Sequence, residues 1–247
     1  MENLVTSPLE TRLKAWHGED WHTSKGRIIR DIVYAIDTGL VTTVSFIAGM
    51  SASLTVRSNL LLAGMVQIAA GTLAIFFGSY ISTKAQKHFF ENQIERERKE
   101  IEEDPRKETE EIRAIFADMG FNEAEREIAV RRITADKNLW LKFMAQEEIG
   151  VSPSFIDNPL EIGFISAVSF LVGSVPAITP FFLFRVPAQA LPASIISVFT
   201  FLFILGIAKT KITKVNWFIS GMETLLIGAL SCGSGFFLGH FAARYFH

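Results

Sequence analysis

The chain has 247 residues, of which 49% are hydrophobic and 20% charged, and its formal net charge is −2 at pH 7. Its one cysteine, Cys232, excludes a disulfide framework and a cysteine metal cluster, so any metal must be held by oxygen, nitrogen or thioether ligands. The sequence also contains no phosphate-binding loop, catalytic triad or nucleic-acid patch, so we do not expect an enzyme or a nucleic-acid partner.

Residues 1–30 form the expected N-terminal segment on the cytoplasmic side. The segment mixes charged residues with no apolar stretch, so we expect no cleavable signal peptide, and the first span should act as the targeting signal. His17 and His22 flank two acidic residues here, a group that could collect metal. The alternative is a terminal tail that binds nothing specific.

Five stretches are long and apolar enough to cross a membrane. At a rise of ~1.5 Å per residue, each can span a hydrocarbon core of ~30 Å. We therefore predict an all-α integral membrane protein, with transmembrane helices 1 and 2 in residues 31–84 and helices 3 to 5 in residues 159–247. The stretches are Ile32–Val56, Ser58–Thr83, Ile162–Phe184, Val186–Ala208 and Thr224–Ala243.

Asp37 is the only charged residue within these five stretches. A carboxylate inside a bilayer costs free energy unless a cation, a proton or a polar cavity receives it, so Asp37 marks a functional site. Other polar residues recur at helical spacing and predict one polar side of the first span: Asp31, Thr38, Thr42 and Ser45. This side is either a wet pathway or a set of hydroxyls bonded to carbonyls of their own helix.

Basic residues gather at one set of span ends, which predicts the orientation. Five of them precede the first span, and Lys209, Lys211 and Lys214 occupy the loop expected between the fourth and fifth spans. By the positive-inside rule, the N-terminus and the long segment after the second span lie in the cytoplasm.

Residues 85–152 form a soluble helical insert between the second and third spans. Residues 85–150 carry 17 of the 26 acidic and 12 of the 24 basic residues. We expect the second span to continue as a helix to Asp104, where Pro105 ends it. Three more helices are predicted: 106–119 closed by Gly120, one from the Asn122 cap to about Thr134, and 137–149.

The insert carries pairs of potential metal ligands one helical turn apart. If its helices fold back on one another, carboxylates and one thioether converge, a ligand set that suits divalent first-row metals. The alternative is a solvated helix surface with ion pairs. None of the predicted insert helices carries a Glu-x-x-His pair, which disfavours a di-iron site. The pairs are Glu97 with Glu100, Glu108 with Glu111, and Met144 with Glu148.

From about His22 onward, the sequence resembles the vacuolar iron transporter family. The resemblance rests on several short segments in the same order around the five spans and the Glu-rich insert. These segments are GRIIRDI at 26–32, DTGLVTT at 37–43, AGMVQIAAG at 63–71, GSYIS at 78–82, Trp140, and FMAQEEIG at 143–150.

The resemblance implies a homodimer whose pore, lined by the first two spans of each subunit, exchanges cytosolic metal for protons. The implied cargo is Fe²⁺, with Mn²⁺, Zn²⁺ and Co²⁺ as further candidates, and no prosthetic group is implied. The partners would be a second copy, membrane lipid, the metal ions and protons. The resemblance also implies that the insert binds metal through Glu97, Glu100, Glu108, Glu111, Met144 and Glu148.

The pore departs from the family pattern. Where the family has an Asp, a Glu and a Met, this chain has Thr38, Gln67 and Ile75, and the first-span carboxylate stands one place earlier, at Asp37. One helical position is a rotation of about 100°, so Asp37 cannot simply point where the family's Asp points. We assign the transport pathway to Asp31, Asp37, Thr38, Thr42, Gln67 and Ile75.

The leading interpretation is an exporter of cytosolic Fe²⁺ or Mn²⁺, working by proton antiport in a bacterial inner membrane or a vacuole-like organelle. The three pore substitutions favour an alternative, a membrane-anchored metal-binding or sensing protein with a closed pore. A di-iron oxidoreductase is a third interpretation, disfavoured because the insert contains only one histidine, His88.

Overall fold

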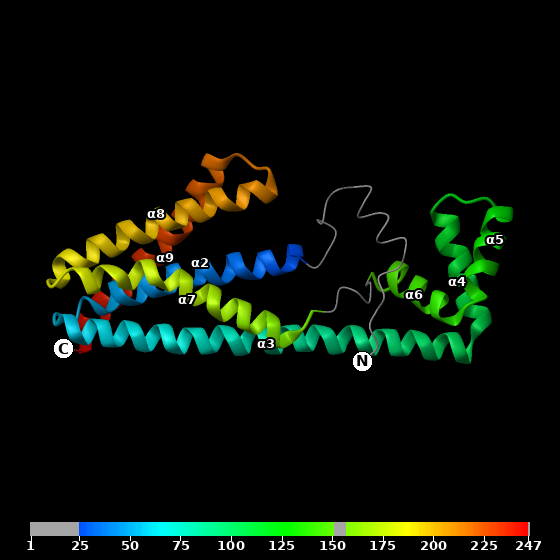
Figure 1. The fold of residues 1–247 in the computed structure, drawn as a ribbon, viewed down its shortest axis with the longest axis horizontal. Coiled ribbons are helices and arrows are strands. Elements are labelled where there is room, and N and C mark those ends of the chain that lie inside the picture. The colour runs from blue at the N-terminus through cyan, green and yellow to red at the C-terminus, as the bar shows by residue number, and fades with distance from the viewer. Residues whose placement is uncertain (1–24, 151–156, 247) are drawn as a thin grey trace. The chain divides into compact units, whose positions relative to one another are not determined.

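The computed structural model describes residues 25–150 and 157–246, and this part of the chain forms eight α-helices without a strand (Figure 1). The all-helical prediction is confirmed for these residues, while His17 and His22 lie outside them. The helices are α2 (Lys25–Met50), α3 (Arg57–Glu103), α4 (Pro105–Asp118), α5 (Glu123–Thr134), α6 (Lys137–Glu147), α7 (Pro159–Leu183), α8 (Pro187–Thr213) and α9 (Trp217–Phe246).

The helices belong to two compact units that divide near Tyr80 and Pro159. Five helices, α2, α3, α7, α8 and α9, are long and apolar enough to cross a membrane, so the chain is a multi-pass membrane protein. Helix α3 has 47 residues, about twice the ~20 that a crossing needs. Its uncharged part, residues 58–83, fits the bilayer, and its charged remainder belongs to the second unit, which we call the insert.

In the membrane unit, α2 packs against α8 and α9. Helix α9 lies close to α2. A Cβ added at Gly235 would meet Ser45, and one added at Gly239 would strike the backbone of Gly49. Small residues permit this approach between membrane helices. Helix α2 ends at Met50, six residues before the predicted end of the first span, because a turn follows at Ser51–Ser53.

The end of α7 is held by α3. Arg57 Nε donates to Phe181 O at 2.7 Å, and Arg57 Nη2 donates to Phe182 O at 3.2 Å. The last carbonyls of a helix have no partner within it, and a guanidinium here supplies one inside an apolar protein. Arg57 therefore fixes the start of α3 against α7.

The predicted insert helices are confirmed to within one or two residues. Asp104 accepts a hydrogen bond from Lys107 N, Pro105 takes the first helical position of α4, and Gly120 follows α4 with a φ of +88°. Asn122 and Glu125 form a reciprocal capping box on α5. The helices enclose an apolar core of Ile101, Ile112, Val130, Ile133, Trp140 and Met144.

Candidate functional site

Three carboxylates converge in the insert from three helical positions. Glu97 lies on α3, Glu108 in the first turn of α4, and Glu148 at the end of α6. One oxygen from each lies within 4.8 Å of the others, so a single metal ion could contact all three. Glu97 and Glu108 are only 3% and 1% exposed, whereas Glu148 is exposed. We call these three residues the acidic cluster.

The acidic cluster is electrostatically strained. Burial, followed by the negative charges of Glu148, Glu108 and Glu100, raises the pKa of Glu97 to about 8. Burial also raises the pKa of Glu108, and the charge of Glu111 adds to this effect, while nearby Lys107 opposes it. Like charges in a site of low polarity favour the protonated form, and a bound cation would reverse that preference.

Two other predicted ligands lie beside the cluster and are held by cations. Glu100 Oε1 accepts from Arg96 Nε at 3.0 Å, and Glu111 Oε1 lies 3.1 Å from Lys107 Nζ. Neither belongs to the group of three whose oxygens converge. Their ion pairs match the alternative interpretation of a solvated, charge-paired surface.

Met144, the predicted soft ligand, is fully buried in the core of the insert. It lies one helical turn before Glu148, whose backbone N–H donates to Met144 O at 2.9 Å. A cavity of about 350 Å³ opens next to the acidic cluster, and Glu100 lies on its wall. The lining residues are Phe89, Gln93, Arg96, Glu97, Glu100, Glu148 and Ile149.

A second polar group lies inside the membrane unit, where α2, α3 and α7 meet. The hydroxyl of Thr43 lies 3.2 Å from Gln67 Oε1 and 3.1 Å from Ser174 Oγ. Gln67 Nε2 lies 3.5 Å from the hydroxyl oxygen of Thr42. Thr43 and Ser174 are almost fully buried. We call these four residues the neutral node, because none of their side chains carries a charge.

Asp37 belongs to a different group. The cation whose charge acts on its carboxylate is Lys209 on α8, and Lys209 Nζ also lies 4.0 Å from Glu223 Oε2 on α9. Lys209 thus belongs to α8, not to the loop in which we expected it, because α8 continues to Thr213. That Lys209 lies on the cytoplasmic side stays a prediction, because it was based on the positive charge of the residue and not on its place in a loop.

The VIT-family model matches residues 29–240, which is most of the chain. The chain belongs to the VIT family. It is 30% identical over 227 residues to a vacuolar iron transporter 1 of Eucalyptus grandis, covering 92% of this chain and 91% of the relative. It is 29% identical to the protein of that name in Arabidopsis thaliana, covering 90% and 89%. A vacuolar iron transporter of Plasmodium falciparum is 27% identical, covering 87% and 85%.

The predicted polar side of the first span is divided in this VIT-family protein. Thr38 Oγ1 donates to Tyr34 O at 2.7 Å, and Thr42 Oγ1 donates to Thr38 O at 2.6 Å. Both hydroxyl protons therefore bond to their own helix, as the second interpretation of this side proposed.

Two further members of the predicted side face other groups. Ser45 lies against Gly235 of α9. Asp31 accepts from Arg30 Nη2 at 3.0 Å at the end of the span.

Sequence reasoning missed Thr43 and Ser174. The adjacent Thr42 and Thr43 could have drawn attention to Thr43, since neighbouring positions on a helix point about 100° apart and Thr43 therefore faces a different side of the helix from Thr42. Nothing in the sequence marks Ser174, which becomes part of the node only because α7 packs against α2.

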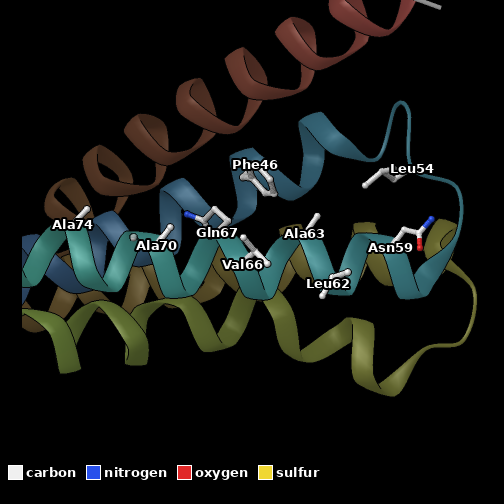
Figure 2. Close-up of a pocket in the computed structure, with 10 residues that line it drawn as sticks. Phe46, Leu54, Asn59, Leu62, Ala63, Val66, Gln67, Ala70 and Ala74 are labelled. Atoms are coloured by element: carbon white, nitrogen blue, oxygen red, sulfur yellow. The ribbon is translucent and has the colours of Figure 1, made fainter.

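A groove of about 780 Å³ runs along α3 in the VIT-family chain, and Gln67 lies in its wall among apolar residues (Figure 2). Ile75, the last predicted pathway residue, is half-buried and is not one of the lining residues. The lining residues are Phe46, Leu54, Asn59, Leu62, Ala63, Val66, Gln67, Ala70, Gly71 and Ala74.

Proposed function

We propose that this protein moves divalent metal ions, Fe²⁺ and Mn²⁺ first among them, out of the cytosol. The acidic cluster is the observation that carries the proposal. Glu97 Oε1 and Glu108 Oε2 are buried and have no hydrogen-bond partner among the described residues. Burying a charged oxygen is costly unless a cation or a donor compensates it, and a divalent metal does so for all three carboxylates at once.

The ligand chemistry supports a first-row metal over magnesium or calcium. Three carboxylate oxygens provide hard ligands, and we propose that Met144 adds a thioether from the adjacent turn of α6. Glu100 and Glu111 complete this set of ligands. Each would leave its ion pair, with Arg96 or Lys107, to bind the metal, because exposed ion pairs contribute little to stability. In the same proposal, Zn²⁺ and Co²⁺ are weaker substrates.

The insert collects metal on the cytoplasmic side and passes it to a pore in the membrane unit. The excess of basic residues at the cytoplasmic span ends supports this orientation. We propose that a second copy of the chain covers the apolar groove along α3, which makes the pore a dimer interface with Gln67 in its wall. The vacuolar names of the relatives support an organelle membrane, and a bacterial inner membrane fits the same charge bias.

Proton antiport is part of the proposal and depends on Asp37. Gln67 and Thr38 cannot titrate, so they cannot exchange a proton for a metal ion. Asp37 is the acidic side chain in the middle of α2, and Lys209 supplies a counter-charge when the metal is absent.

A second candidate function is a metal-binding or sensing protein whose pore does not conduct. It is favoured by the neutral pore positions, where the hydroxyls of Thr38 and Thr42 are already bonded to their own helix. In that case the acidic cluster binds metal and no ion crosses the membrane.

Reconstitution in proteoliposomes tests both candidates. Purified protein is assayed for Fe²⁺ and Mn²⁺ flux with and without a pH gradient, alongside Asp37→Ala and Glu97→Gln. We expect flux that the gradient accelerates and that Asp37→Ala abolishes. Flux that ignores the gradient contradicts antiport alone, and metal binding without any flux replaces the transporter with the sensor.

A further inference from the structure

The hydrogen bonds of the neutral node require more protons than its side chains possess. Ser174 Oγ donates its only proton to Phe170 O at 2.9 Å, because a carbonyl oxygen can only accept. Thr43 has one proton as well, yet its oxygen lies at hydrogen-bond distance from two acceptors, Ser174 Oγ at 3.1 Å and Gln67 Oε1 at 3.2 Å. One of these two contacts therefore has no proton between its two oxygens.

A half-turn of the Gln67 carboxamide removes the conflict. The nitrogen and oxygen of a carboxamide exchange places in this turn without moving any other atom, and the hydrogen-bond network decides which arrangement holds. After the turn, Gln67 Nε2 donates to Thr43 Oγ1, Thr43 donates to Ser174 Oγ, and Ser174 donates to Phe170 O. The only contact given up is the 3.5 Å bond to Thr42, which is at the outer limit for a hydrogen bond.

We propose that Thr43 and Ser174 are positioning residues that turn the carbonyl oxygen of Gln67, a residue of the groove wall, toward the hydroxyl of Thr42, and that these two neutral oxygens together bind a divalent cation. The proton of Thr42 is bonded to Thr38 O, so its oxygen offers lone pairs. The two oxygens are 3.5 Å apart. Neighbouring oxygens of an octahedral site with metal–oxygen distances of about 2.1 Å lie about 3 Å apart, so a small closure fits them.

The orientation of Gln67 determines whether the groove attracts or repels a cation. Gln67 is the one amide side chain in the middle of the groove wall, where its other neighbours are apolar (Figure 2). A carbonyl oxygen attracts a metal ion, whereas an NH₂ group repels it. Two neutral oxygens leave the ion part of its water shell, so it binds weakly and can leave again, as a transport pathway requires. This inference rests on the proposed metal transport.

The test uses Mn²⁺ flux in proteoliposomes containing the full chain, measured as KM and kcat. Thr43→Val keeps the size of the side chain and removes the hydroxyl. Ser174→Ala removes the acceptor of the Thr43 proton, so that this proton goes to the Gln67 oxygen and the NH₂ group turns to the groove. We expect both variants to raise KM roughly 3- to 10-fold, the effect of one lost hydrogen bond, with a smaller change in kcat. Thr43→Ser should restore the wild-type KM.

A second background separates positioning from a general structural role. Glu at position 67 presents an oxygen to the groove in every orientation, so in Gln67→Glu protein the change Thr43→Val should alter KM less than twofold. Equal losses in both backgrounds overturn the proposal, as does an unchanged KM in Ser174→Ala. If Thr43→Val does not fold, Ser174→Ala decides alone. Wild-type protein that carries neither Mn²⁺ nor Fe²⁺ overturns the transport function itself, whereas transport with an unaltered KM in the variants overturns only this inference.

Discussion

In the insert, Glu97 and Glu108 each bury one carboxylate oxygen that has no hydrogen-bond partner among the described residues, whereas in the membrane unit Thr43 and Ser174 bury hydroxyls that are bonded to their neighbours. The difference follows from the surroundings. The insert is rich in charged residues, and we propose that it lies in water, from which ions and protons can reach and neutralise a carboxylate. A carboxylate inside hydrocarbon costs several kcal/mol, so a path built of amide and hydroxyl oxygens is cheaper there. Under the proposed function, the insert would therefore bind the metal tightly and the membrane unit would bind it weakly.

Removal of the buried carboxylates should produce the largest effect. Glu97→Gln combined with Glu108→Gln keeps the shape of the cluster and removes two charges, so we expect the affinity for Mn²⁺ to fall at least about 100-fold, since even outer-shell changes cost 10- to 100-fold. Calorimetry on the full chain measures this. Glu127→Gln is the matched control: its partner is Arg113 at 2.6 Å, away from the acidic cluster, and binding should not change. Equal losses in both proteins would refute the cluster as the metal site.

Metal binding by the insert should depend on pH through Glu97. Glu97 has a pKa of about 8, so binding at neutral pH displaces its proton, and affinity should rise up to tenfold per pH unit until about pH 8. Without metal, the folded insert holds this proton between pH 4.5 and 8 while the unfolded chain does not. Stability of the metal-free insert therefore falls as pH rises through this window and levels off above it. Calorimetry in buffers of different ionisation enthalpy counts the released protons, and a count of zero contradicts the pKa shift.

Close packing of α2 and α9 should decide whether the membrane unit keeps its geometry. A Cβ at Gly239 would strike the backbone of Gly49, whereas nothing lies within 4 Å of a Cβ at Gly233. We expect Gly239→Ala to destabilise the protein by about 1–3 kcal/mol, the usual cost of overpacking, and Gly233→Ala to be nearly neutral. Thermal unfolding in detergent compares them. Equal midpoints for the two variants would show that α9 does not depend on this contact, and metal binding by the insert should be the same in both.

The smallest effect on stability is expected at Met144. Met144→Leu conserves volume in the core of the insert and should cost less than about 1.5 kcal/mol, so the protein remains folded. If the thioether is a ligand, the variant should lose affinity for Fe²⁺ and Co²⁺ more than for Mn²⁺, because sulfur favours the softer ions. Competition binding among the three metals measures the ratio. An unchanged ratio would leave Met144 as a packing residue only.

The prediction from sequence was most successful where structure is local. Pro105, Gly120 and Asn122 predicted the insert helices to within one or two residues, since a cap or a ring acts on its own turn. The uncharged runs predicted all five membrane helices, since hydropathy and length are also properties of a single continuous segment. The pathway face of the first span was less predictable. Helical spacing grouped Ser45 with Thr42, but it could not say that Ser45 lies against α9, because the neighbour that covers a helix face depends on how the helices assemble.

The sequence alone determined the membrane class, the five spans, the helical insert and the pairs of candidate ligands, since length, hydropathy and capping act over a few residues. Tertiary structure decided which ligands meet. Glu97, Glu108 and Glu148 converge only because α3, α4 and α6 fold onto one core, while Glu100 and Glu111 pair with cations on their own helices. It likewise brought Asp37 within electrostatic reach of Lys209 and linked Gln67 to Ser174 through Thr43. The hydrogen bond between Thr43 and Ser174 joins residues 131 positions apart, and no local pattern encodes it.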